Sequence, residues 1–179
     1  ISKAKEMAEE GMQVIALASK KESNKVLVLN EKEENDMTFI GFVAFLDSPK
    51  KDVKNVIEKL NKYDVKVKIL TGDNPYSTKS VCLLAGINSE KIYLGSDIDK
   101  LSDKSLSKVV EEVDVFARLN PIQKERIVRI LRENNHVVGY MGDGINDAPS
   151  LKESDIGLSV NGATDIAKES SDMILLEKS

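Results

Sequence analysis

The sequence predicts an α/β protein, in which a parallel sheet carries helices on both faces, preceded by a smaller part of another kind. After residue 49, short apolar stretches alternate with helix-like segments, which is the pattern of repeated strand–helix units. Residues 1–46 offer strands and one helix without this alternation. Pro49 cannot continue a strand ladder and separates the two patterns. We therefore expect two parts, residues 1–46 and residues 47–179.

Composition excludes several classes of protein. The chain has 179 residues, 41% apolar and 31% charged, an ordinary globular balance that can support a core. With 26 Lys and Arg against 30 Asp and Glu, the net charge of −4 argues against a nucleic-acid partner. A single cysteine, Cys82, excludes an internal disulfide and fits a reducing compartment. No apolar run approaches the roughly 18 residues of a membrane helix.

The first part is expected to hold one helix and several strands. Apolar residues at helical spacing predict a helix over residues 1–10, and Gly11 is expected to end it. Strands are expected at residues 14–18, 26–29 and 38–46. Because the sequence opens at Ile1 and stops just after an apolar strand, we expect a fragment of a longer protein.

The second part is expected to alternate regularly. Helices are predicted where apolar residues recur on one face, and strands where apolar residues run together. The expected helices span residues 51–62, 75–84, 102–111, 121–133, 148–153 and 164–170. The expected strands span residues 65–70, 92–94, 115–119, 137–141, 156–160 and 173–176. Such sheets bind ligands at the carboxyl ends of their strands, so polar residues there are candidates for a site.

One polar cluster follows the strand at residues 65–70. Thr71 can donate a hydrogen bond to an anion, and Gly72 allows close backbone approach. Amide groups at the start of the next helix would add partial positive charge. An ordinary turn from strand to helix would contain the same residues, so this cluster alone leaves both interpretations open.

A second cluster contains a lysine near the start of the helix at residues 121–133. A cation in the first turn or so opposes the helix dipole, so Lys124 indicates an anionic partner. The alternative is a solvated surface lysine.

A third cluster, residues 142–149 (GDGINDAP), follows the strand at residues 137–141. Asp143, Asn146 and Asp147 lie within five residues, and carboxylates at this density suit a hard cation such as Mg²⁺. The alternative is a Gly-Asp turn with capping side chains. The order of the glycines does not match the dinucleotide-binding pattern, which argues against a Rossmann dehydrogenase. Together the clusters place a hydroxyl, an ammonium and carboxylates on one sheet edge, a combination typical of phosphoryl transfer.

These motifs resemble those of haloacid-dehalogenase-like phosphotransferases, and more specifically the cytoplasmic phosphorylation domain of P-type ATPases, the cation pumps. The resemblance covers about residues 36–179, while residues 1–46 are similar to the last part of the family's nucleotide-binding domain. The matching segments are residues 47–50 (DSPK), 71–73 (TGD), 116–124 (FARLNPIQK) and 142–149. Residues 45–50 and 165–179 resemble the bacterial magnesium-transporting branch, with calcium pumps next.

The resemblance implies a role for each matching residue. Phosphate binding falls to Thr71, Gly72, Lys124 and Asn146, Mg²⁺ binding to Asp143 and Asp147, and nucleotide or hinge contacts to Asp73, Asp47 and Lys50. Of these, Thr71, Lys124, Asp143 and Asp147 would be catalytic. Mg²⁺ and ATP are the implied cofactors of the intact protein. Lys at position 50, where the family often has Arg, keeps the charge but loses the bidentate fork.

The residue that carries the phosphoryl group in this family is missing from the sequence. In the family it is the Asp of an Asp-Lys-Thr-Gly-Thr motif, and Thr-Gly occurs here only at Thr71. Residues 97–101 (DIDKL) half match the wider superfamily's nucleophile pattern, but a surface loop with a capping Asp is favoured. We therefore expect a cytoplasmic fragment of a cation pump that is inactive alone. The alternatives are a soluble phosphatase of this superfamily and a catalytically dead regulator that binds phosphate or nucleotide.

The missing strand also has a structural consequence. In the family it lies between the strand that ends at Thr71 and the one that ends at Asp143, and unpaired edges are unfavourable. We expect these two strands either to pair directly or to pair with another chain, such as a second copy. The expected partners are the transmembrane, actuator and nucleotide-binding segments of the same pump, ATP and the transported cation, with no nucleic acid. The intact protein would place this soluble part at the cytoplasmic face of a membrane.

Overall fold

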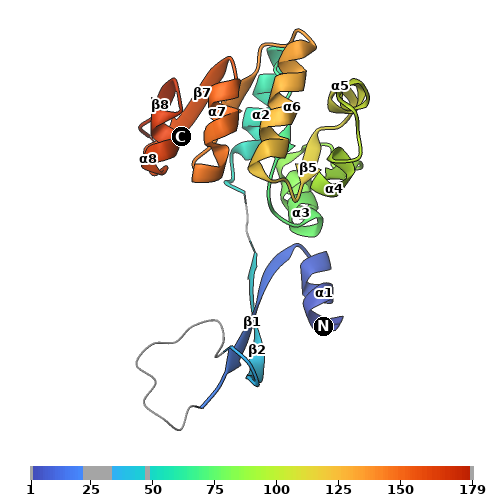
Figure 1. The fold of residues 1–179 in the computed structure, drawn as a ribbon, viewed down its shortest axis with the longest axis vertical. Coiled ribbons are helices and arrows are strands. Elements are labelled where there is room, and N and C mark those ends of the chain that lie inside the picture. The colour runs from blue at the N-terminus through green and yellow to red at the C-terminus, as the bar shows by residue number, and fades with distance from the viewer. Residues whose placement is uncertain (1, 22–33, 47–48, 178–179) are drawn as a thin grey trace.

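A computed structural model describes residues 2–21, 34–46 and 49–177. Its first part holds helix α1 (Ser2–Glu9) and a hairpin of β1 (Met12–Ser19) and β2 (Thr38–Leu46), set apart from the body in Figure 1. The strands are antiparallel, with Met12 opposite Leu46 and Ser19 opposite Thr38. Gly11 ends α1 in the left-handed region at φ 87°. The strand expected at residues 26–29 lies outside the described residues.

The second part alternates strands and helices. Its helices are α2 (Val53–Lys62), α3 (Pro75–Ala85), α4 (Gly95–Ile98), α5 (Asp103–Glu112), α6 (Pro121–Glu133), the 3₁₀ turn η2 (Ile145–Asp147), α7 (Ala148–Glu153) and α8 (Asp165–Glu169). Its strands are β3 (Ile69–Leu70), β4 (Ile92–Leu94), β5 (Val115–Ala117), β6 (Gly139–Met141), β7 (Ile156–Val160) and β8 (Met173–Leu175). Every strand pair among them is parallel, which confirms the α/β class.

Four strands are shorter than the apolar pattern predicts: β5 and β8 end two residues and one residue early, and β3 and β6 begin late. Residues 65–70 and 137–141 were expected to be strands, but β3 contains only Ile69–Leu70 and β6 only Gly139–Met141. The neighbouring strands explain this, because β5 begins only at Val115, opposite Ile69, and β7 begins at Ile156, opposite Gly139. Within the described residues, no strand pairs with residues 65–68 or with residues 137 and 138. The short helix α4 and the turn η2 were not expected from the sequence.

The strands form two separate three-stranded sheets in the order β3-β5-β4 and β6-β7-β8. Direct pairing of the strands that lead to Thr71 and Asp143 is therefore wrong for the described residues. Helix α6 links the two sheets instead, because Ile127 packs in the core of the first sheet and Val128 in that of the second. Leu70, in β3, and Val138, just before β6, each pack against both cores.

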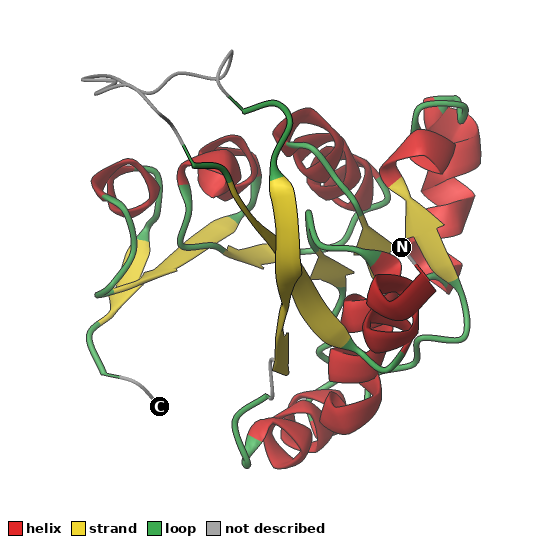
Figure 2. Ribbon diagram, turned by 90° about the horizontal axis from the view of Figure 1, so that it is seen from below, coloured by secondary structure: helices red, strands yellow, loops and turns green. Residues whose placement is uncertain are grey.

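Burial differs between the two sheets. In the first, all three residues of β5 are 0% exposed, and helices surround it. In the second, helices α7 and α8 lie on one side, and Figure 2 shows no described helix on the other side of these strands near the C-terminus. Apolar side chains are exposed there, including Met141, Ile156 and Met173. A parallel sheet is normally covered on both faces, so this exposed apolar face is of the kind that other elements usually cover.

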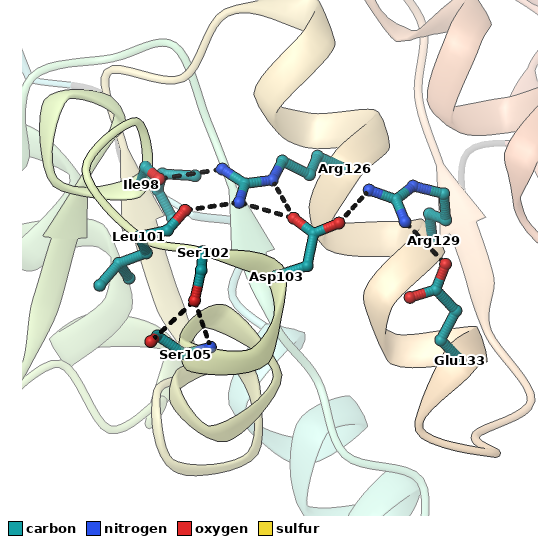
Figure 3. Close-up of polar contacts among 8 residues, drawn as sticks. All are labelled: Ile98, Leu101, Ser102, Asp103, Ser105, Arg126, Arg129 and Glu133. Carbon is teal, nitrogen blue, oxygen red and sulfur yellow. Dashed lines mark hydrogen bonds and ion pairs between the residues drawn. The ribbon is translucent and has the colours of Figure 1, made fainter.

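An arginine pair fixes α6 against the segment between β4 and α5. The Arg126 guanidinium donates to the carbonyl oxygens of Ile98 at 3.0 Å and Leu101 at 2.6 Å, and to Asp103 (Figure 3). Arg129 donates to the other Asp103 oxygen at 3.0 Å. Arg126 and Arg129 are the sixth and ninth residues of α6. Their hydrogen bonds therefore hold the part of the helix that follows Lys124.

Candidate functional site

Hydrogen bonds join the three motif loops at the carboxyl edge of the strands. The Leu119 amide, after β5, donates to the Thr71 carbonyl at 2.9 Å, and the Arg118 amide donates to the Asp73 carbonyl at 2.9 Å. Lys124, one turn into the next helix, donates from Nζ to Oδ1 of Asp147 at 2.8 Å. The structure thus connects the Thr71 loop, the start of α6 and the loop after β6.

Arg118 lies at this junction with a backbone conformation that the sequence does not reveal. Its φ is 52°, in the left-handed region that non-glycine residues rarely adopt. Backbone strain of this kind persists only where surrounding contacts enforce it, and it concentrates at functional sites. Here the hydrogen bonds from the backbone amides of Arg118 and Leu119 to the Thr71 loop enforce this conformation.

The Thr71 loop is closed by its own side chains. Thr71 Oγ1 donates to Asp73 Oδ2 at 3.0 Å and accepts from the Asp73 amide at 3.1 Å. The Asn74 carboxamide oxygen caps α3 by accepting from the amides of Tyr76 and Ser77, each at 3.0 Å. The amides of Tyr76 and Ser77 thus already have a hydrogen-bond partner within the chain.

Lys124 is not a solvated surface lysine. Its side chain is 12% exposed and that of Asp147 is 13% exposed. The sequence places it accurately, because Asn120 and Gln123 form a reciprocal cap and Pro121 begins the helix. The anionic partner indicated by the position of Lys124 is, within this chain, Asp147.

Asp147 is the most highly coordinated acid of the site. Its Oδ1 accepts from Lys124 and from the Tyr140 hydroxyl, both at 2.8 Å, and its Oδ2 accepts from the Gly144 amide at 3.3 Å. Burial opposes ionisation, but the hydrogen bonds from Lys124 and Tyr140 outweigh it, so the pKa of Asp147 lies below its usual value. Gly142 packs closely here, since a Cβ on it would lie 2.5 Å from the Asp147 Cβ.

Tyr140 is the site residue that the sequence did not identify. It lies in β6 among apolar residues, where a tyrosine most simply indicates core packing. Only the fold shows that its hydroxyl reaches Asp147, seven residues further along the chain. No sequence signal could have separated this role from simple burial.

Asp143 and Asn146 lie exposed on the same loop. The Asp143 carbonyl accepts from the Thr164 amide at 3.0 Å, while its carboxylate makes no hydrogen bond within the described part of the chain. Across residues 2–21, 34–46 and 49–177, no group of three His, Cys, Asp or Glu side chains could hold a metal ion. Any Mg²⁺ would therefore rest on two carboxylates and water, a donor set that this cation accepts.

The remaining predicted residues lie apart from this cluster or outside the described residues. Lys50 is exposed and its carbonyl accepts from the Val53 amide at 3.1 Å, while Asp47 lies outside the described residues. The Asp97 carboxylate accepts from the Leu94 amide at 3.2 Å and caps α4. The expected capping Asp is confirmed, but the expected surface loop is wrong, because Gly95–Ile98 form helix α4 and Ile98 is fully buried.

Comparison with known proteins decides the family. The model of the family described as haloacid dehalogenase-like hydrolase matches residues 5–155, most of the chain. The chain belongs to this family. Membership confirms the resemblance inferred from the motif segments, and the fold agrees with it.

Among curated relatives, this haloacid dehalogenase-like chain is similar to P-type ATPases. It is 44% identical to "Magnesium-transporting ATPase, P-type 1" of Salmonella typhimurium, over 99% of the chain and 20% of that protein. It is 38% identical to "Calcium-transporting ATPase 1" of Saccharomyces cerevisiae, over 97% of the chain and 19% of that protein. The chain thus spans about one fifth of the length of these relatives.

A solved structure gives the same result. The crystal structure of a zinc-transporting PIB-type ATPase in the E2.Pi state superposes with a TM-score of 0.61 and 26% identity. The match covers 97% of this chain and 22% of that one. Within the described residues, no helix of the haloacid dehalogenase-like chain has both the length and the apolar character required to cross a membrane.

Proposed function

We propose that the chain is the phosphate- and magnesium-binding part of a cation-transporting P-type ATPase. In the intact protein it would help to form and hydrolyse an aspartyl phosphate whose Asp is supplied by another segment. The observation that carries this proposal is the direct hydrogen-bonded connection between the Thr71 loop, the start of α6 and Asp147. The identity to magnesium- and calcium-transporting relatives supports it.

The site residues divide the work by their chemistry. Thr71, Gly72 and Asn146 would surround the phosphoryl group, and Lys124 would neutralise it. Asp143 and Oδ2 of Asp147 would hold Mg²⁺, which when bound stabilises negative charge on the phosphoryl oxygens. Asp73 would face the nucleotide of ATP, with Lys50 and Asp47 at the hinge.

The uncovered surfaces support a larger polypeptide as the partner. Among the described residues, β3 and β6 each have one edge without a strand partner, and one parallel strand between these edges would complete a single sheet. The bare face of the β6-β7-β8 sheet would then be covered by helices of the same protein. Residues 1–46 would complete a nucleotide-binding domain, and residues 47–179 a phosphorylation domain, at the cytoplasmic face of the membrane. The transported cation would be a metal ion of the kind named for the relatives, Mg²⁺ first.

A soluble phosphatase is the second candidate, and the structure weakens it. That enzyme needs a nucleophile within the chain, and the half-matching motif offers only Asp97. The Asp97 carboxylate instead caps α4, beside the outer strand of the β3-β5-β4 sheet. A regulator that binds phosphate without catalysis would need no nucleophile and is separated by binding experiments on the intact protein.

The first test is hydrolysis of a small phosphate ester by the purified chain with Mg²⁺. Wild type, Asp97→Asn and Asp143→Asn are assayed side by side. We expect no turnover in any of them, because the part of the chain that the structure describes places no nucleophile at the site. Turnover in wild type that both substitutions abolish would contradict the proposal and favour the phosphatase.

The second test supplies the missing strand. A peptide with the Asp-Lys-Thr-Gly-Thr motif at the end of an apolar strand is titrated into the chain, and sedimentation reports the mass. We expect a one-to-one complex, and a control peptide with Pro in the strand should not bind. A homodimer that excludes the peptide would show instead that the edges pair between two copies.

A further inference from the structure

The Asp147 carboxylate has two donors on the same oxygen, and they come from different elements. Lys124 reaches it from α6 and Tyr140 from β6, each at 2.8 Å. The lysine is a mobile partner, since its ammonium sits at the end of a flexible stem. The proposed function requires this ammonium to turn from Asp147 to a phosphoryl group.

Tyr140 is a fixed partner by contrast. It is 7% exposed and packs with Val128, Leu151 and Ala167. Its backbone pairs with β7, opposite Gly157. Burial, followed by the neighbouring Asp147 charge, raises the pKa of Tyr140 above its usual value, so the phenol remains a hydrogen-bond donor.

Departure of the lysine would leave Asp147 in a costly position. A largely buried carboxylate that loses its ion-pair partner loses much of the interaction that offsets its desolvation. Two hydrogen bonds to the Asp147 carboxylate would remain. The one from the Gly144 amide is long, at 3.3 Å, whereas the one from the Tyr140 hydroxyl is short, at 2.8 Å, and is lost if the carboxylate moves. The hydroxyl is therefore the contact that can retain the carboxylate.

We infer that Tyr140 is a positioning residue that holds Asp147 in place when Lys124 leaves it. The inference rests on the proposed function for the reason why Lys124 leaves, and on the geometry alone for what Tyr140 does. Tyr140 touches neither phosphate nor metal in this assignment. It acts only through Asp147.

The direct test needs no ligand. Lys124→Met removes the ammonium permanently, and backbone NMR signals of Gly144 and Asp147 report the loop, because these residues are hydrogen-bonded to each other. We expect sharp, single signals in Lys124→Met, and broadened or doubled signals when Tyr140→Phe is added. Unchanged amides of β5 show that the fold persists. Equal spectra for the single and double variants would overturn the inference, as would a loop already disordered in Lys124→Met.

A matched control is available on the first sheet. Tyr93 is half-buried in β4, and its hydroxyl makes no hydrogen bond in the described part of the chain. Tyr93→Phe in the Lys124→Met background should leave the Gly144 and Asp147 signals unchanged. If the double variant Lys124→Met, Tyr140→Phe does not fold, the single variant Tyr140→Phe is used instead. The hydrogen-exchange rate of its Gly144 amide is compared with that of wild type. Exchange several-fold faster than in wild type supports the inference, and an equal rate overturns it.

A second measurement separates this inference from the proposed function. Inorganic phosphate is titrated with Mg²⁺ and followed by ³¹P NMR. We expect Tyr140→Phe to raise the phosphate Kd about tenfold, the size of a hydrogen bond to a charged group, and Lys124→Met to abolish binding. If wild type binds no phosphate, the proposed function fails in this chain while the ligand-free spectra still decide the role of Tyr140. If phosphate binds with the same Kd in Tyr140→Phe, the inference fails and the proposed function stands.

Discussion

The β3-β5-β4 sheet and the β1–β2 hairpin contain similarly apolar strands but bury them very differently. Phe116 of β5 is 0% exposed, whereas Phe39 and Phe45 of β2 are 55% and 51% exposed. The first sheet has helices packed around it, and the hairpin projects away from the body (Figure 1). A two-stranded ribbon is marginal in water on its own, so the hairpin needs further partners for its apolar surface. Apolar sequence therefore predicts burial only where the rest of the polypeptide is present.

The largest expected effect tests this contrast directly. Phe116→Ala should lower the free energy of unfolding by about 3–5 kcal/mol, because it removes a fully buried ring and leaves a cavity. Phe45→Ala should cost less than about 1 kcal/mol, since that ring is half exposed already. Urea unfolding measures both. A large loss for Phe45→Ala would mean that the hairpin is buried in solution against another chain.

The next effect concerns ion pairs in the two regions. At pH 7, Lys124→Met should cost about 3 kcal/mol, because the substitution leaves Asp147 without its buried partner. The matched change on α1, Lys3→Met, removes a pair that is 75% and 59% exposed and should cost less than about 0.5 kcal/mol. Chemical denaturation at constant ionic strength compares the two variants.

The difference in unfolding free energy between wild type and Lys124→Met should become smaller in acid. The folded pKa of Asp147 is depressed, so its stabilising contribution is present above the unfolded pKa of about 3.9 and is lost as pH falls through the folded value. The gap between wild type and Lys124→Met should therefore narrow below about pH 4. Unfolding curves collected at several pH values check this, and a gap that widens in acid would contradict the ion pair.

A smaller effect is expected from backbone crowding. A Cβ on Gly95 would lie 2.4 Å from Oε1 of Gln123 and 2.5 Å from the Arg118 carbonyl oxygen. Gly95→Ala should therefore cost about 1–3 kcal/mol and disturb the start of α6. Gly41→Ala in the hairpin is the control, because nothing lies within 4 Å of its Cβ position. Thermal unfolding of both should show a loss for Gly95→Ala only.

The smallest loss of stability is expected from a substitution in residues 97–101, the segment that half matches the superfamily's nucleophile pattern. Asp97→Asn removes the charge of a carboxylate that caps α4, so it should cost less than about 1 kcal/mol. Its Tm should stay within a few degrees of wild type. A large loss of stability would show that Asp97 does more than cap a short helix.

The residue pattern alone determined the α/β class, the bounds of helix α6 and strand β7, and the motif loops. These are local properties, since periodicity, caps and prolines act over a few neighbouring residues. It also placed Lys124 at the start of a helix next to an expected anion. The residue pattern could not show whether that anion belongs to the same chain, because this depends on where the fold places Asp147.

Tertiary structure decided what pairs with what. Lys124 is buried against Asp147, Tyr140 donates to the same oxygen, and Asn74 caps the amides at the start of α3. The two strands that lead into the site lie in separate sheets, and α6 contributes side chains to the cores of both. Contacts between residues far apart in sequence depend on the packing of whole elements, which no local pattern encodes.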